Sequence, residues 1–135
     1  MTIRLPKDED KHISGTDDIA RIMLKILWRQ NKIHRKKEYF WTVGLNTAND
    51  IDYIELVTIG TSNRNIAEPV DILSLPVSKK CKKIILCHNH PSGKLEPSEQ
   101  DILFTERITK AAAILGIEVL DHLIITENNY VTIDL

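Results

Sequence analysis

Two histidines and an aspartate lie close enough in the sequence to bind one metal ion. The apolar run 84–87 is short and partly β-branched, which predicts a buried strand ending at His88. Side chains on a strand alternate in direction, so His88 and His90 point the same way. A proline and a glycine then predict a turn, and Asp101, on the first turn of the next helix, can come back to the two imidazoles. Two nitrogens and one oxygen form a three-ligand set, typical of catalytic zinc sites because the fourth position is left to water.

The same residues also have a simpler structural interpretation. A single histidine at a strand end is usually an ordinary surface or core residue. Residues 98–101 are a plausible helix start, with Ser98 as the N-cap and Asp101 at the third position, where a carboxylate favours the helix dipole. Capping and ligation can both hold, and capping alone does not explain two histidines that face the same way. We therefore predict a metal site at His88, His90 and Asp101.

A family resemblance supports this prediction. The string His-Asn-His-Pro-Ser-Gly at residues 88–93, followed by Ser98 and Asp101, resembles the motif of the JAMM (MPN+) metallopeptidases and in particular their RadC branch. The string Asp-His-Leu-Ile-Ile at residues 121–125 is similar to the same branch. The resemblance extends from about Ile13 to the C-terminus.

The resemblance implies a role for each of these residues. It implies one Zn²⁺ per chain, bound by His88, His90 and Asp101, and an oxyanion that Ser98 helps to hold. It also implies a glutamate at the start of the first long strand that holds the attacking water, and Glu38 is the matching residue. A separate carboxylate is required because one bound to the metal cannot also carry the proton.

Other titratable residues compete for these roles. Glu38 could be an ordinary solvated residue at the end of a basic run. Glu55, inside a predicted strand, and Glu68, beside a predicted helix start, are weaker candidates for the general base. We expect His122 to make a buried structural hydrogen bond, oriented by its neighbour Asp121, rather than to bind the metal.

Hydrophobic periodicity predicts an α+β fold with helices packed around one mostly antiparallel sheet, in the order αββαβαββ. The resemblance implies the JAB/MPN (cytidine-deaminase-like) architecture. We expect residues 1–135 to form a single domain of the RadC type, with residues 1–12 as a loose arm. The predicted helices cover residues 16–33, a short segment from Pro69, and 98–115; the predicted strands cover 38–45, 51–60, 84–88, 119–126 and 130–133.

Two features of the sequence depart from the family pattern, and one polar loop lies outside its motif. Pro69 is followed by Val70, where the family commonly has arginine, and Pro76 is expected to end or kink the short helix. Residues 60–65 form a polar loop with several backbone donors. The chain is too short to include the N-terminal helix-hairpin-helix region that longer family members carry and that is associated with DNA binding.

Composition narrows the classes of partner. The net charge of −1 argues against a surface made mainly to bind nucleic acid. We interpret the basic runs 34–37 and 79–83 as solvent-exposed surface rather than as nucleic-acid contacts. Cys87 alternates away from His88 and is expected to be a core thiol; with Cys81 as the other cysteine, a reduced compartment is indicated. Without a signal-peptide pattern or a membrane-length apolar run, the protein is expected to be cytoplasmic.

Three classes of function follow. The ligand set and Glu38 favour a zinc-dependent metallohydrolase that cleaves peptide or isopeptide bonds of a protein or peptide substrate. The alternative is a DNA-repair-associated protein that binds DNA or a repair partner without peptidase activity, which the family's repair label favours and these residues support only weakly. A scaffold module without turnover is the third class, and the intact motif argues against it. The sequence does not identify the substrate or the oligomeric state.

Overall fold

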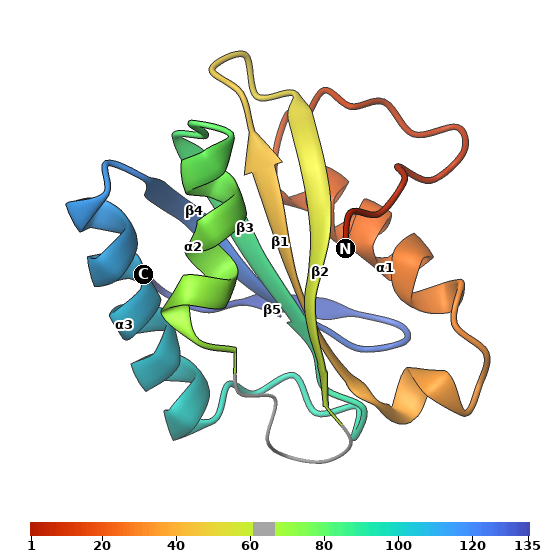
Figure 1. Ribbon diagram of the computed structural model, residues 1–135. Helices are drawn as coiled ribbons and strands as arrows, with labels where there is room; N and C mark the ends of the chain where they lie inside the picture. Colours follow the sequence, from red (N-terminus) through yellow and green to blue (C-terminus); the bar gives the residue numbers. More distant parts are fainter. Residues whose placement is uncertain (61–66) are drawn as a thin grey trace.

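The computed structural model describes residues 1–60 and 67–135 of the chain and consists of one five-stranded sheet with helices on both faces (Figure 1). The elements are α1 (Thr16–Trp28), the 3-10 turn η1 (His34–Lys36), β1 (Glu38–Leu45), β2 (Ile51–Gly60), α2 (Pro69–Ser78), β3 (Lys83–Asn89), α3 (Glu99–Ile114), β4 (Glu118–Ile125) and β5 (Tyr130–Thr132). The α+β class, the order αββαβαββ and the bounds of β1 and β2 are confirmed. The polar loop predicted at residues 60–65 lies almost wholly outside the described residues.

The sheet has the strand order β2-β1-β3-β4-β5 and is antiparallel except for the pair β3 and β4. Parallel neighbours need a crossover connection, and α3 supplies it between these two strands. The central strands β1 and β3 are buried along almost their whole length, because helices cover both faces of the sheet.

Side-chain alternation divides the core into two layers. On one face, α1 packs against Trp41 and Val43 of β1 and Cys87 of β3. On the other face, α2 and α3 pack against Phe40 and Leu86. Cys87 is fully buried on the α1 side, and burial raises the pKa of its thiol. The prediction of a core thiol that faces away from His88 is confirmed.

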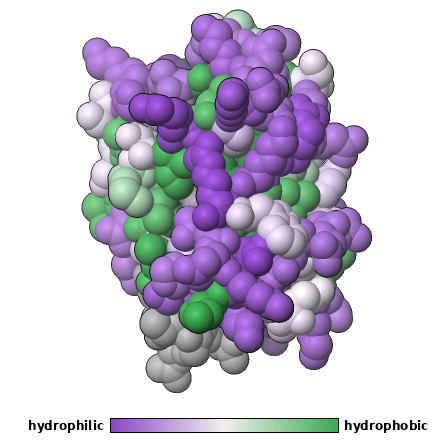
Figure 2. Space-filling model, turned by 90° about the vertical axis from the view of Figure 1, so that its right-hand side faces the viewer, coloured by the Kyte–Doolittle hydropathy of each residue, from purple (hydrophilic) through white to green (hydrophobic). Residues whose placement is uncertain are grey.

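The helix α1 begins at the predicted residue but ends earlier than predicted. The N-cap is Gly15, and the Thr16 hydroxyl donates to Asp121 across the α1–sheet interface. The helix ends at Trp28, short of residue 33. The apolar stripe is buried only as far as Leu27, and Ile33, which extended the pattern, is 75% exposed. Without an apolar surface to bury, continuing the helix gains nothing. The outer side of the molecule over α1 is mostly hydrophilic (Figure 2).

The predicted effect of Pro76 is only partly correct. Pro69 begins α2 as expected, but Pro76 lies inside this helix, which continues to Ser78. Proline removes one backbone hydrogen bond in a helix, and here that loss falls in the last turn.

The N-terminal arm is not loose, which corrects our expectation for residues 1–12. Ile3 donates its N–H to the carbonyl of Ile54, and its side chain packs against the α1 layer. Glu9 accepts hydrogen bonds from Arg21 and Lys25 of α1. Backbone bridges to the exposed edge of β2 satisfy groups that an edge strand would otherwise leave unpaired. Among residues 1–60 and 67–135, no helix is long and apolar enough to cross a membrane.

Candidate metal centre

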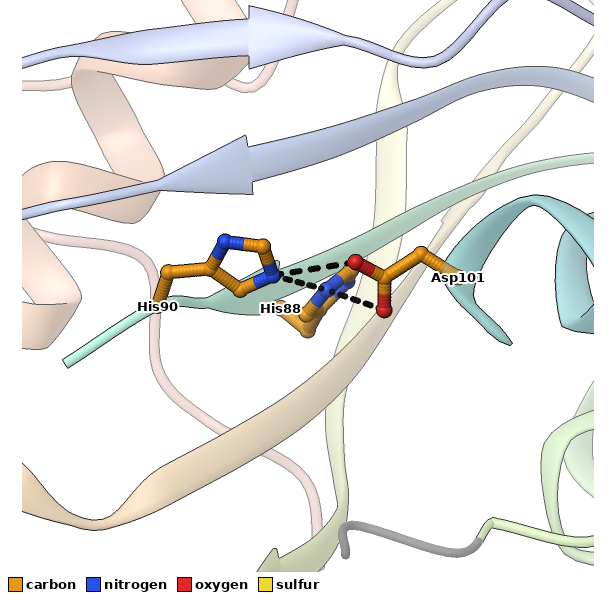
Figure 3. Close-up of side chains that lie close together, drawn as sticks. All are labelled: His88, His90 and Asp101. Carbon is orange, nitrogen blue, oxygen red and sulfur yellow. Dashed lines mark hydrogen bonds and ion pairs between the residues drawn. The ribbon is translucent and has the colours of Figure 1, made fainter. Parts of the chain in front are cut away.

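The predicted ligands converge at the C-terminal end of β3 (Figure 3). His88 is 8% exposed and lies on β3 between β1 and β4. His90 follows the strand, where its N–H donates to the carbonyl of Ile125 and its ring Nδ1 contacts the carbonyl of Lys94 at 2.8 Å. The strand therefore places one imidazole, and the turn after it holds the other.

The helix that carries Asp101 begins at this same point. The Ser98 hydroxyl accepts from the N–H of Asp101 at 3.0 Å, and the Ser98 N–H donates to Asp101 Oδ2 at 2.8 Å. This reciprocal capping box satisfies two N-terminal backbone donors. It also fixes the carboxylate, because the oxygen that accepts from Ser98 is the one that contacts His90. The capping prediction for Ser98 is confirmed.

The donor atoms of the three residues lie close enough together to surround one metal ion, with each imidazole nearest to a different oxygen of Asp101. His88 Nε2 and His90 Nε2 are 3.2 Å apart, His90 Nε2 and Asp101 Oδ2 are 3.1 Å apart, and His88 Nε2 and Asp101 Oδ1 are 3.3 Å apart. Bonds of about 2.0–2.1 Å at tetrahedral angles place zinc ligands roughly 3.3 Å from one another. The three residues can thus hold a metal ion together, and one coordination position remains for water or substrate.

The electrostatics of the cluster favour a cation at its centre. Burial acts to raise the pKa of Asp101, but hydrogen bonds with His88 and His90 outweigh it and hold that pKa well below the ordinary range. The hydrogen bond with Asp101 raises the pKa of His90. The carboxylate therefore stays ionised and attracts positive charge to the point where the ligand atoms meet.

Two side chains outside the candidate ligand set, His122 and Thr105, form a hydrogen-bonded chain that ends at His88. His122 is fully buried on β4, with its Nε2 at 2.8 Å from His88 Nδ1 and its Nδ1 at 2.6 Å from Thr105 Oγ1. Thr105, on α3, donates its hydroxyl to the carbonyl of Asp101 at 2.7 Å. The buried structural hydrogen bond predicted for His122 is confirmed, but Asp121 does not orient it. Asp121 accepts from Thr16 instead.

These contacts determine which nitrogen of each ring carries a hydrogen. Thr105 has one hydroxyl hydrogen and gives it to Asp101, so it must accept from His122 Nδ1. Burial lowers the pKa of His122 well below its usual value, and the neutral ring then has a lone pair at Nε2. His88 must donate from Nδ1, so in its neutral form its Nε2 lone pair faces Asp101 and His90. Metal-binding histidines commonly have such a second partner, which orients the ring.

Glu38 begins β1 on the same face of the sheet as His88. Phe40 pairs with His88 across the β1–β3 ladder, and Glu38 lies two residues earlier, so its side chain has the same direction. Its negative charge is among the causes that raise the pKa of His90. The weaker candidates have other contacts: Glu55 faces the N-terminal amine, and Glu68 caps α2 and pairs with Arg107.

Asn89 holds the backbone on both sides of Glu38. Its Oδ1 accepts from the N–H of Tyr39 at 2.6 Å, and its Nδ2 donates to the carbonyl of Lys37 at 2.9 Å. The side chain is 1% exposed. Sequence reasoning placed Asn89 on the opposite side from the two histidines but assigned it no role. The available signal was a polar side chain at the end of an otherwise apolar strand.

Comparison with known proteins identifies relatives along most of the chain. Residues 13–134 match the family model of the RadC-like JAB domain. UPF0758 proteins of Clostridium botulinum, Alkaliphilus metalliredigens and Methanosarcina mazei are 45%, 39% and 35% identical to this protein, over 89%, 87% and 94% of its chain. These matches cover 50%, 49% and 53% of the relatives, so the chain spans about half the length of the curated proteins it resembles.

Proposed function

The chain belongs to the RadC-like JAB domain family, and we propose that it is a zinc-dependent hydrolase that cleaves a peptide or isopeptide bond. The observation that carries this proposal is the cluster of His88, His90 and Asp101, three residues whose donor atoms lie close enough to hold one metal ion. Three protein ligands and an open position are characteristic of catalytic rather than structural zinc sites. The relatives' names state no activity, so the reaction is inferred from the site.

The side chains around the centre divide the chemistry. When bound, zinc lowers the pKa of a coordinated water to about 7 and polarises the substrate carbonyl. Glu38 takes a proton from the attacking water and passes it to the leaving amine, because it is a carboxylate outside the ligand set. The Ser98 hydroxyl that accepts from Asp101 keeps its own hydrogen, and this hydrogen is the donor we assign to the oxyanion.

Metal analysis tests the proposal. We expect about one zinc per chain in the purified protein and loss of zinc in His88→Ala and His90→Ala, because two remaining ligands are too few. His34→Ala is the matched control, since the His34 contacts are made by its backbone N–H and carbonyl. Unchanged zinc content in the His88/His90 double variant would refute the site.

Turnover requires a separate assay with a library of peptides. The wild-type protein should cleave library members, and a zinc chelator should stop cleavage. A zinc-loaded protein that cleaves neither peptide nor isopeptide bonds would contradict the proposed reaction while leaving the metal site intact. The DNA-associated alternative rests on the family's repair label, and the names of the UPF0758 relatives state no role in DNA repair.

A further inference from the structure

A cavity of about 360 Å³ shares one residue, His90, with the candidate metal centre. Its walls come from the end of α1 and the segment after it, from the turn 90–95, and from the connection between β4 and β5. His90 and Asn89 line it, so the cavity adjoins both the metal ligand and the clamp that holds Glu38. A substrate bound at the metal centre could therefore place an adjacent side chain or chain end in this cavity.

The cation in this cavity is Arg35. Its guanidinium carbon lies 3.9 Å from the centroid of the Trp28 ring, a stacked arrangement that arginine favours. Trp28 is itself fixed, because its indole N–H donates to the carbonyl of Glu127 at 2.6 Å. The preceding residue, His34, accepts from the hydroxyl of Tyr39 through its carbonyl. Arg35 is therefore held in place by its neighbours rather than extended into solvent.

The guanidinium of Arg35 has a donor that no group in residues 1–60 and 67–135 accepts. Its Nε is buried and has no hydrogen-bond partner. Among residues 1–60 and 67–135, no carboxylate forms an ion pair with it within 4.0 Å, although Glu127 also lines the cavity. A buried donor without a partner is costly, and such groups in native proteins need an explanation. An acceptor that enters the cavity beside this guanidinium supplies one.

We propose that Arg35 binds a carboxylate of the substrate next to the metal centre. The inference rests on the proposed hydrolase function and adds the substrate class: a peptide with an acidic side chain or a free C-terminus close to the cleaved bond. A guanidinium fork matches a carboxylate with two parallel hydrogen bonds. The cavity is of the size that holds a side chain or a chain end. Residues 34–38 thus present a cation to this cavity and, at Glu38, the base to the metal centre.

Binding of three small probes tests the proposal. The probes are acetyl-triglycine with a free carboxylate, its C-terminal amide, and the same amide with glutamate as the last residue. Nuclear magnetic resonance follows the Nε–H signal of Arg35, assigned by its loss in Arg35→Lys. We expect at least one acidic probe to shift this signal and to bind about tenfold or more tightly than the neutral amide, as a charge-assisted hydrogen bond provides. The probe that does so identifies the source of the carboxylate.

Matched variants separate Arg35 from general charge. Arg35→Gln should abolish the preference for the acidic probe, whereas Arg29→Gln should keep it, because Arg29 makes the same charge change but bonds to the carbonyl of Arg4 outside the cavity. Equal binding of acidic and neutral probes, or an unchanged preference in Arg35→Gln, overturns the proposal. The readout does not need zinc, so it can be repeated on chelator-treated protein. A failed zinc site is thereby distinguished from a failed carboxylate site.

Discussion

Replacing Thr105 with valine should weaken zinc binding although Thr105 is not a ligand. The change removes the oxygen that accepts from His122 Nδ1. His122 is then free to carry its hydrogen on Nε2, where it can no longer accept from His88. His88 in turn loses the partner that keeps its hydrogen on Nδ1, and its Nε2 lone pair is no longer reserved for the metal. The effect passes through two hydrogen bonds, of 2.6 and 2.8 Å, before it reaches a ligand.

The expected magnitude follows from the loss of one outer partner of a metal ligand. Such losses typically cost 10- to 100-fold in metal affinity, so the zinc dissociation constant of Thr105→Val should rise by about that factor. The free energy of unfolding should fall by about 1–3 kcal/mol, because Thr105 is 2% exposed and the loss of its hydroxyl leaves a buried N–H without an acceptor. Removing His88 itself should instead abolish zinc binding, which makes the two classes of variant distinguishable.

Two measurements and one control test this reasoning. Zinc affinity is measured by competition with a chelator of known affinity, and nitrogen-15 spectra of the metal-free protein report which ring nitrogen of His88 carries the hydrogen. Thr105→Ser is the control, since it keeps the hydroxyl. We expect Thr105→Ser to retain both the Nδ1–H form of His88 and the zinc affinity. If Thr105→Val binds zinc within twofold of Thr105→Ser, the relay has no influence on the metal site.

Three further predictions concern single residues. Glu38→Gln should keep zinc and fold but lose hydrolysis, and loss of zinc in this variant would make Glu38 a ligand. Ser98→Ala should lower the free energy of unfolding by about 1 kcal/mol through the lost cap and lower turnover about 100-fold. Ser98→Asp should restore stability but not turnover. If Ser98→Asp restores both, the serine acts only as a cap. Hydrogen bonds from Arg21 and Lys25 lower the pKa of Glu9 from 4.5 to about 2, so its stabilisation is complete above pH 4.5 and is lost as the pH falls towards 2. Glu9→Gln should lower the free energy of unfolding by about 1 kcal/mol at neutral pH, because Arg21 and Lys25 are half exposed. The unfolding temperature of this variant should depend less on pH between 4.5 and 2 than that of the wild-type protein. An unchanged dependence on pH contradicts the pairing.

Local sequence patterns predicted the elements and the cluster at the end of β3. Strand alternation was sufficient to place Cys87 in the core and His88 on the opposite face, because the period of two is a local property of the backbone. The cap at Ser98 was equally local, since its donors and acceptors lie three residues apart. The proximity of His88, His90 and Asp101 could be predicted because they belong to one strand, one turn and one helix start.

The contacts that support the ligands could not be predicted in this way. His122 reaches His88 because β3 and β4 are parallel and Leu86 pairs with His122, which leaves His88 diagonally adjacent. That register joins two strands that α3 separates in the sequence, so it is a long-range property of the fold. The N-terminal arm was missed for the same reason. Its polar composition indicated a loose segment, but the bonding partners of Ile3 and Glu9 lie far along the chain, at Ile54 and in α1.

The placement of the base depends on the same strand as the ligands. Antiparallel pairing of β1 with β3 sets Phe40 opposite His88, and a slip of one residue would turn Glu38 to the other face of the sheet. Asn89 opposes such a slip because its amide bonds the backbone on both sides of Glu38. Three consecutive residues, from His88 to His90, therefore supply two candidate metal ligands on one side and the clamp for the proposed base on the other. This is a physical reason for a buried asparagine to lie between the two histidines.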